Sequence, residues 1–438
     1  MFLAILIINL LIWLTSSRLI LSKKNIFNQA GLLKLVVSFF LSFSLISMLF
    51  ILSVYWYIDF RFFLLFLSLV SLLFYFKFNL KQVKFKIDFF NKPSYRLLAV
   101  LLSLLAISLF FIDNAYKWGG WDSFAIWSMH AKFLTYKNYW SNYFTDVLDW
   151  SHPDYPLMLS SYISIIWKGA GAINGVVPSI IAYITLIAVP LSAYSFLTSQ
   201  NLKLSGLVFL IIMALDNKFI EISSWLNADT LLALFFLLTF ILYYHSKDGN
   251  GNKNILFLLG FFAASCGWIK NEGLLFYFVF SVCFLLLNFK NPKDILRYIC
   301  GSVIPLLMIV SLKFIYATEN DIMKGQNENT FEKVMDFNRY EVIFKYFAGE
   351  LFSHYKIILI FFALTLIFNR NYFKSFSFVV LMIMLSGYFA IYVITPQELK
   401  SHLATSCERL FHQLYPSLMF TMLFVPGKNF NTFSFGKL

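Results

Sequence analysis

The stretch DTLLALFFLLTFILYYH, from Asp229 to His245, decides the fold of this 438-residue chain. It carries no charge between its two ends and approaches the ~20 residues that an α-helix needs to cross the apolar part of a bilayer. A helix satisfies its own backbone N–H and C=O groups, which lipid cannot do. Similar apolar runs recur along the whole sequence, so the predicted fold class is an all-α polytopic membrane protein.

The composition supports this prediction, because 60% of the residues are hydrophobic, 20% aromatic and only 13% charged. Soluble domains are about half apolar and a quarter charged. We predict about 12–14 transmembrane helices, several of them short enough to tilt or insert partly. The candidate spans are 1–17, 33–57, 62–77, 97–112, 157–168, 175–197, 204–215, 229–245, 254–268, 273–289, 297–316, 356–368, 375–395 and 410–426.

The net charge of +13 is concentrated in short loops rather than on one face. Lysines and arginines gather in loops that we place in the cytoplasm by the positive-inside rule, namely 18–32, 78–96, 246–253, 290–296 and 369–374. This distribution argues against nucleic acid as a partner. The segments left outside are 113–156, 269–272, 317–355 and 396–409. Between 157 and 228 three apolar runs link two outer ends, so one run must be re-entrant or return part of the way.

We therefore treat the chain as one integral membrane unit with three parts. N-terminal transmembrane helices occupy 1–112, the first large outer loop occupies 113–156, and the remaining helices occupy 157–438 with the outer loop 317–355. The N-terminal run lacks a basic leader and a small-residue cleavage site, so we interpret 1–17 as a membrane helix. The four cysteines form no CxxC pair and indicate neither a disulfide framework nor a cysteine metal site.

The first outer loop reads KWGGWDSFAIWSMHAKFLTYKNYWSNYFTDVLDWSHPDYPLM, from Lys117 to Met158. Its tryptophans are typical of a membrane interface, where an aromatic ring has one apolar face and one wet edge. We expect short amphipathic helices there. Asp122 follows the preceding span directly, and His152, Pro153 and Asp154 precede the next apolar run.

Three further polar clusters stand at predicted outer boundaries. Asn227 and Asp229 precede one span, Lys270 and Glu272 separate two spans, and Arg409 lies with His402 before the last one. Each has an ordinary explanation: a helix N-cap, a hairpin turn and a snorkelling arginine.

All four clusters fall on the same side under a single topology. Ionisable groups at membrane depth are expensive and usually functional. We therefore predict a shared outer cavity that holds Asp122, Asp154, Asp229, Lys270 and Arg409.

Sequence motifs exclude some chemistry and leave metal binding open. There is no Walker A motif, dinucleotide fingerprint, HExxH or GxSxG elbow. Cofactors stay unknown. A divalent cation held by carboxylates such as Asp122 and Asp154 remains an alternative.

In these motifs the sequence resembles the GT-C glycosyltransferase superfamily, in particular the family 39 branch with protein O-mannosyltransferases and lipid A aminoarabinose transferases. The resemblance covers about residues 95 to 420. It rests first on Trp121-Asp122 through Trp127, Ala131-Lys132, and His152 to Leu157. Weaker matches follow in order at Asn227-Ala228-Asp229, at Lys270-Asn271-Glu272-Gly273, and at His402-Leu403 with Ser406 and Arg409. The usual acidic pair is absent, since Ser123 follows Asp122, and Asp154 is the substitute for the second carboxylate.

The resemblance implies transfer of a sugar from a polyprenyl-phosphate donor to a glycan, lipid or protein acceptor. It implies a bacterial inner membrane with the active site on the periplasmic side, facing membrane lipids. Asp122 is the expected general base, with His152 and Asp154 as further catalytic residues. The expected substrate-binding residues are Trp121, Lys132, Asp229, Lys270, Glu272, His402 and Arg409. Direct displacement would invert the anomeric centre. The alternative is a transporter or flippase for lipid-linked sugars, although such proteins often show inverted repeats and mid-span charges, which we do not find here.

Overall fold

A computed structural model describes residues 31–77, 95–136, 138–247, 254–320, 324, 330–368 and 370–427. These residues form helices joined by loops and contain no strand, which confirms the all-α prediction. The first half contains α2 (Gly31–Tyr55), α3 (Phe60–Lys77), α4 (Tyr95–Asn114), η2 (Ser123–Ser128), α5 (Met129–Thr135), η3 (Trp140–Tyr143), η4 (Asp146–Ser151), α6 (Met158–Ala170), α7 (Val176–Ser199), α8 (Lys203–Leu215) and α9 (Asn217–Ser224). The second half contains α10 (Asp229–Lys247), α11 (Ile255–Ile269), α12 (Asn271–Asn288), α13 (Pro292–Ile315), α15 (Thr330–Met335), α16 (Phe337–Ser353), α17 (Lys356–Phe368), η5 (Arg370–Lys374), α18 (Phe376–Ile394), α19 (Leu399–Phe424) and η6 (Val425–Gly427).

The chain is a multi-pass membrane protein. Among the described residues, seven helices are long and apolar enough to cross a bilayer: α2, α4, α7, α10, α12, α13 and α18. An eighth span results if α16 and α17, which meet at 86°, are counted together. Shorter apolar helices lie at Phe60–Val70, Lys203–Leu215 and Ile255–Ile269. The expected number of about 12–14 spans includes such shorter helices and the run 1–17, which lies outside the described residues.

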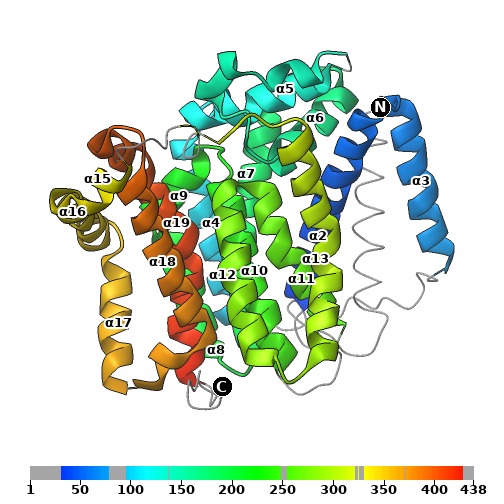
Figure 1. Cartoon of the computed structure of the whole chain (residues 1–438). Coiled ribbons are helices and arrows are strands. Elements are labelled where there is room, and N and C mark those ends of the chain that lie inside the picture. Colours follow the sequence, from blue (N-terminus) through cyan, green and yellow to red (C-terminus); the bar gives the residue numbers. More distant parts are fainter. Residues whose placement is uncertain are drawn as a thin grey trace.

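Helix α10 forms the centre of the bundle. Nearly every residue from Asp229 to Tyr244 is buried, as expected for a helix that is apolar on all sides. It packs against α7, α11 and α19, and aromatic contacts join it to α11, where Phe235 lies 5.3 Å from Phe262, and to α12, where Phe236 stacks on Phe276 at 4.0 Å. The run that decides the fold class is therefore also the core around which the other helices gather (Figure 1).

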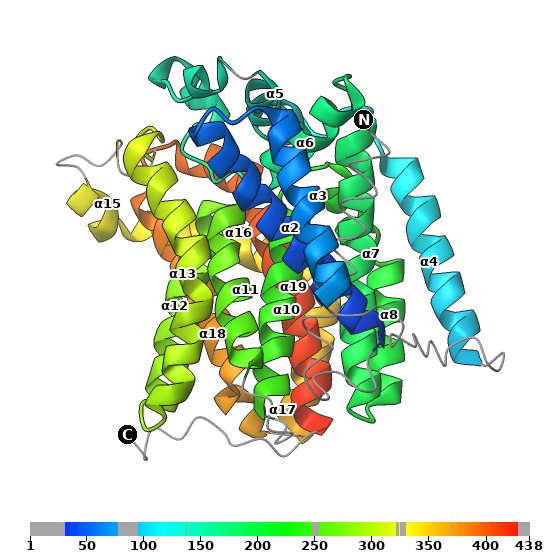
Figure 2. The ribbon, with the colours of Figure 1, turned by 90° about the vertical axis from the view of Figure 1, so that its right-hand side faces the viewer.

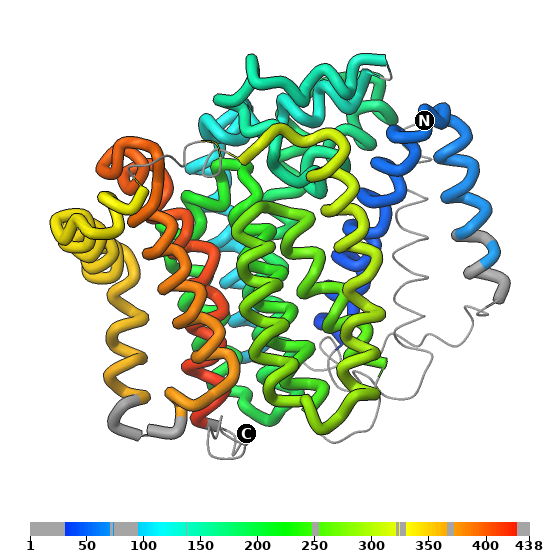
Figure 3. Tube along the Cα trace, in the orientation of Figure 1, coloured from blue at the N-terminus to red at the C-terminus, as the bar shows by residue number. Residues whose placement is uncertain are grey.

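The loops predicted to share one side do lie at one end of the bundle. Figures 1 and 2 show α4 ending there, α10 beginning there, and the α11–α12 and α18–α19 connections beside them. The first large loop, with η2, α5, η3 and η4, covers this end, which we call the site end. The α12–α13 and α17–α18 connections lie at the opposite end (Figure 3). The charge pattern thus predicted the relative arrangement of these connections, while the basic loops 18–32, 78–96 and 246–253 lie largely outside the described residues.

Helix α6 resolves the odd number of apolar runs between 157 and 228. Near its start, Ser161 contacts Ser47 at 2.6 Å, and Ser47 also accepts a hydrogen bond from Trp268 at the end of α11. Near its end, Trp167 meets Trp118, which follows α4, at 6.4 Å. Both ends of α6 therefore lie near the site end. The predicted span at 157–168 does not run the length of the bundle. Helix α7 leads away from the site end, and α8 and α9 together lead back to it.

Candidate functional site

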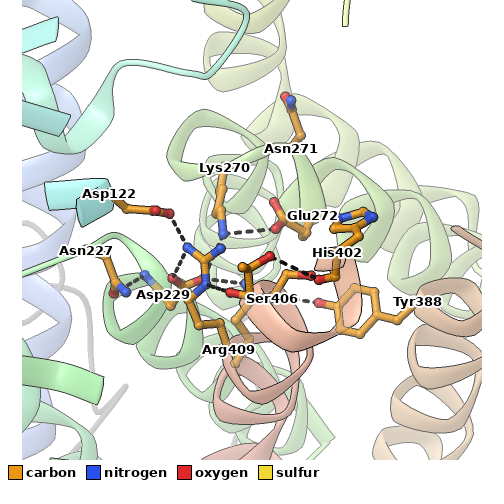
Figure 4. A network of polar contacts seen from close by, with 12 residues as sticks. Asp122, Asn227, Asp229, Lys270, Asn271, Glu272, Tyr388, His402, Ser406 and Arg409 are labelled. Atoms are coloured by element: carbon orange, nitrogen blue, oxygen red, sulfur yellow. Dashed lines mark hydrogen bonds and ion pairs between the residues drawn. The ribbon is translucent and has the colours of Figure 1, made fainter. Parts of the chain in front are cut away.

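A cavity of about 660 Å³ opens at the site end between the first large loop and the ends of α12, α18 and α19. Most of the residues predicted to form the site line this cavity. They are Trp121, Asp122, His152, Lys270, Glu272, His402 and Arg409. Leu274, Leu275 and Ile391 add an apolar wall. Figure 4 shows the charged groups pointing toward one another from separate segments. Three of the four predicted polar clusters, which are distant in sequence, therefore line one cavity.

Helix α19 contributes a polar stripe to this cavity. His402, Ser406, Arg409 and Gln413 recur every three or four residues, so they lie along one face of the helix. Glu398 fixes the start of α19 by accepting hydrogen bonds from the backbone N–H groups of Ser401 at 2.6 Å and Lys400 at 3.1 Å. These same bonds hold the pKa of Glu398 below its ordinary value.

Asp122 and Arg409 form the central ion pair of the cavity. The Nη1 group of Arg409 donates to Oδ2 of Asp122, and its Nε group donates to the backbone oxygen of Thr405 at 3.2 Å. Both side chains are partly exposed to the cavity, 16% for Arg409 and 23% for Asp122. A phosphate or carboxylate that enters the cavity can therefore reach the guanidinium group.

Two glycines explain how Asp122 reaches this position. Gly119 adopts a φ of +73°, and a Cβ atom there would lie 2.3 Å from the backbone oxygen of Trp225. Gly120 donates its N–H to that same oxygen at 2.9 Å. Only glycine tolerates both the left-handed backbone and the close approach. The loop is thus docked against the segment that leads to Asp229, and the π-helix η2 begins directly after Asp122.

Asp229 lies below the cavity and organises the cations of the site. It is 1% exposed, and its Oδ1 atom accepts from Lys270 at 2.8 Å and from Gln413 at 2.5 Å. Its Oδ2 atom lies 4.0 Å from Arg409. A buried carboxylate persists only when it is paired and hydrogen-bonded, and Asp229 meets both conditions. Its side chain does not cap α10 but lies between two cations, Lys270 and Arg409.

Lys270 stands in the tight connection between α11 and α12. It is 3% exposed and contacts Asp229 at 2.8 Å and Glu272 at 2.9 Å. Burial alone would lower the pKa of Lys270, but the two carboxylates outweigh burial and raise it. Gly273 allows this geometry, since a Cβ atom there would lie 1.9 Å from the backbone oxygen of Cys266.

Asp154 serves a different purpose from Asp122. It is 1% exposed and does not belong to the cavity wall. Its Oδ2 atom accepts from Asn271 and from Asn320, each at 2.7 Å, and from Lys313 at 3.3 Å. These contacts join the first large loop to α12, α13 and the segment after α13. The predicted catalytic or metal-binding role of Asp154 stays a prediction, and its observed contacts are those of a buried anchor.

The other predicted residues fall into two groups. His152 has a left-handed backbone with a φ of 50° and stacks on Tyr155 at 4.7 Å, and both line the cavity. Trp121 is 69% exposed at the cavity rim, 6.3 Å from Trp150. Lys132 instead lies exposed on α5, away from the cavity wall. Within the described part of the chain, no group of three or more His, Cys, Asp or Glu side chains is arranged to hold a metal ion.

Sequence reasoning missed the residues that support the charges from below. The hydroxyl of Tyr388 donates to Gln413 at 2.7 Å, and Gln413 in turn donates to Asp229. Gln413 could have been predicted, because it lies four residues after Arg409 and therefore on the same face of the helix. Tyr388 lies in an apolar run that has no distinguishing pattern. Lys313 could have been noticed as a single lysine near the end of an apolar helix.

Comparison with protein-family models, with curated proteins and with solved structures gave no match for this chain.

Proposed function

We propose that this protein is a membrane glycosyltransferase that transfers a sugar from a polyprenyl-phosphate donor to an acceptor hydroxyl. The observation that carries the proposal is the direct contact of Asp122 with Arg409 in a cavity that also contains Lys270. A carboxylate beside two cations provides both a base and a site for a phosphate leaving group. The resemblance to family 39 enzymes points to the same chemistry and to the periplasmic face of a bacterial inner membrane.

Arg409 is the proposed ligand of the donor phosphate. Its guanidinium group has five N–H donors, so it can bind two phosphate oxygens at once. Lys270 is buried close to Arg409 and adds positive charge to a site that is partly shielded from water. Cations fixed in advance stabilise the negative charge that develops on the departing phosphate. The apolar wall at Leu274, Leu275 and Ile391 suits the adjoining polyprenyl chain.

Phosphate binding would also activate Asp122. In the structure Arg409 pairs with Asp122, and the donor phosphate competes for this same arginine. Once Arg409 turns to the phosphate, the carboxylate of Asp122 is free to accept a proton. Donor binding would thereby prepare the base, and the acceptor would react only when the donor is in place.

The transfer itself is a single displacement. The acceptor oxygen attacks the anomeric carbon while its proton passes to Asp122. The bond from the anomeric carbon to the phosphate oxygen breaks, and its electron pair leaves with the polyprenyl phosphate. General base catalysis of this kind contributes roughly 10²–10⁴-fold to the rate. Attack from the side opposite the phosphate inverts the anomeric centre.

The remaining residues position the reactants. Asp229 holds Lys270 and Gln413 in place by direct contact and lies 4.0 Å from Arg409. His152, Glu272, His402 and Trp121 line the cavity where the sugar and the acceptor would lie. The charges gather at one end of the bundle, which favours an enzyme over a transporter that moves its substrate across the bundle.

The proposal can be tested in cells that lack the gene. Complementation with the wild-type gene should restore an envelope glycan that mass analysis detects, whereas Asp122→Asn should not. Asp113→Asn is the matched control, because Asp113 lies exposed at the end of α4 outside the cavity wall. If Asp122→Asn restores the glycan at equal expression, Asp122 is not the base.

A further inference from the structure

Helix α16 differs from the spanning helices in its direction and in its pattern. It runs from Phe337 to Ser353 and meets α17 at an angle of 86°. Figures 1 and 3 show α17 running along the bundle while α16 crosses its side near the site end. Because α17 follows the direction of the bundle, a helix at nearly a right angle to it lies roughly in the plane of the bilayer.

One face of α16 packs on the protein. Ile343 is fully buried, and Phe347 contacts Phe389 of α18 at 5.6 Å and Phe411 of α19 at 5.3 Å. Arg339 donates to the backbone oxygens of Val393 at 3.0 Å and Tyr392 at 3.1 Å. These contacts fix the rotation of α16 about its own axis, so the direction of its other faces is determined.

The exposed surface of α16 is divided into an apolar and a polar face. Phe337 and Phe344 are seven residues apart, lie on one face of the helix and are 84% and 67% exposed, whereas Phe352, also 67% exposed, lies at the border with the polar face. Asn338, Lys345 and Gly349 form a second exposed row beside them. Glu341 lies at the same border and pairs with Lys345 at 2.5 Å. A helix in water has no reason to expose a row of phenylalanines next to a separate polar row.

The depth of α16 is set by its neighbour. Lys356 is exposed at the first turn of α17 and is followed by an uninterrupted apolar run. A lysine at such a junction places its charge among the lipid headgroups. Because only two residues separate Ser353 from Lys356, the end of α16 lies at the same level.

We propose that α16 is an interfacial helix whose row of exposed phenylalanines, Phe337 and Phe344, enters the lipid bilayer while the row with Lys345 faces water. Such helices place their apolar face ~5–10 Å into the boundary between headgroups and acyl chains. The occupant of the phenylalanine row is therefore lipid, not a second protein. This inference does not depend on the proposed glycosyl transfer.

Spin-label depth measurements test this directly. Cys266, Cys283, Cys300 and Cys407 are first replaced by serine or alanine. Single cysteines are then introduced as Phe344→Cys and Lys345→Cys, labelled with a nitroxide and reconstituted in phospholipid vesicles. Oxygen concentrates in the hydrocarbon and a nickel chelate stays in water. The ratio of oxygen to nickel collision rates should be several-fold higher at position 344 than at 345.

Two results would overturn the inference. Nickel access at position 344 equal to that at 345 would place both rows in water. A label at 344 that is immobilised and shielded from both reagents would show a protein partner on this face. Ala348→Cys provides a second site on the apolar side for the case that replacing Phe344 lowers expression, and it should give the same high ratio.

Discussion

Asp122 and Arg409 are 287 positions apart in the chain, and they form a direct ion pair in the wall of the cavity at the site end. Two separate structural features bring these residues together. Gly119 and Gly120 dock the first large loop on Trp225, and Glu398 fixes the start of α19. The pair is therefore a product of the whole fold, and its disruption should affect binding and catalysis in different ways.

Binding of polyprenyl phosphate should separate the roles of the two partners. Every donor of the proposed class releases this product, so the measurement does not require knowledge of the sugar. Arg409→Gln removes charged hydrogen bonds of ~1.5–3 kcal/mol, which corresponds to about tenfold to hundredfold weaker binding. Asp122→Asn removes the competitor for Arg409 and should bind at least as tightly as wild type. Native mass spectrometry in nanodiscs would report both, and weaker binding by Asp122→Asn would contradict the exchange of Arg409 between partners.

Lys270 and Lys132 offer a matched pair of lysines. Lys270→Met leaves Asp229 buried beside an uncharged side chain, and breaking a buried pair in this way costs about 3–5 kcal/mol. Lys132→Met alters an exposed side chain on α5 and should stay within ~0.5 kcal/mol. The thermal midpoint in detergent should fall clearly for the first variant and barely for the second. Equal midpoints would show that Asp229 does not depend on Lys270.

Gly119 should tolerate no larger residue. In Gly119→Ala the new Cβ atom meets the backbone oxygen of Trp225, and a left-handed backbone costs a non-glycine residue ~1–3 kcal/mol. We expect a lower thermal midpoint together with reduced binding of polyprenyl phosphate, because the loop that carries Asp122 must shift. Gly349→Ala is the control, since nothing lies within 4 Å of a Cβ atom there. A Gly119→Ala variant with wild-type values in both assays would remove the docking role.

His130 should make the first large loop sensitive to acid. It is buried in α5, and its Nε2 atom contacts the backbone oxygen of Ser151 at 3.3 Å. Burial lowers the pKa of His130 from 6.5 to about 3. The unfolded chain therefore takes up a proton first as the pH falls below 6.5, and stability is lost progressively between pH 6.5 and about pH 3.

The contribution of His130 can be isolated by comparing variants across pH. From pH 7 to pH 5 the wild type should lose about 2 kcal/mol through this residue, on the basis of 1.36 kcal/mol per pKa unit. His130→Phe keeps a ring against Trp127 and Tyr143 and should lose correspondingly less over this interval. His354→Gln, at an exposed histidine, should follow the wild type. The same pH dependence in wild type and His130→Phe would contradict this account.

Two properties of the sequence, the length of its apolar runs and the position of its basic loops, predicted the fold and much of the cavity. Apolar length predicted most of the helices to within a few residues, as for 229–245 and α10 at Asp229–Lys247, whereas α19 begins at Leu399, 11 residues before the predicted span 410–426. The basic loops indicated which connections share an end, and this brought Asp122, Lys270 and Arg409 to one side. The sequence of a membrane protein predicts the helices and the sides of the loops because lipid excludes charged side chains and unpaired backbone groups.

What the sequence did not predict depends on packing in three dimensions. The run that forms α6 was predicted as a span, and its contacts with Ser47 and Trp118 show that it stays near one end. Asp154 carries the same charge as Asp122, and its burial with Asn271 and Lys313 is set by segments far away in sequence. Hydropathy does not distinguish a carboxylate in the cavity from one beneath it.

The most direct test of the central claim is turnover of a polyprenyl-phosphate sugar by the purified protein in vesicles. A panel of such donors is supplied with an envelope extract as acceptor, and release of polyprenyl phosphate is followed by mass spectrometry. We predict release from at least one donor by the wild type and by Asp113→Asn, and a loss of ~10²–10⁴-fold in Asp122→Asn despite retained binding of polyprenyl phosphate. Release by Asp122→Asn at the wild-type rate, or no release from any donor by the wild type, would contradict the claim.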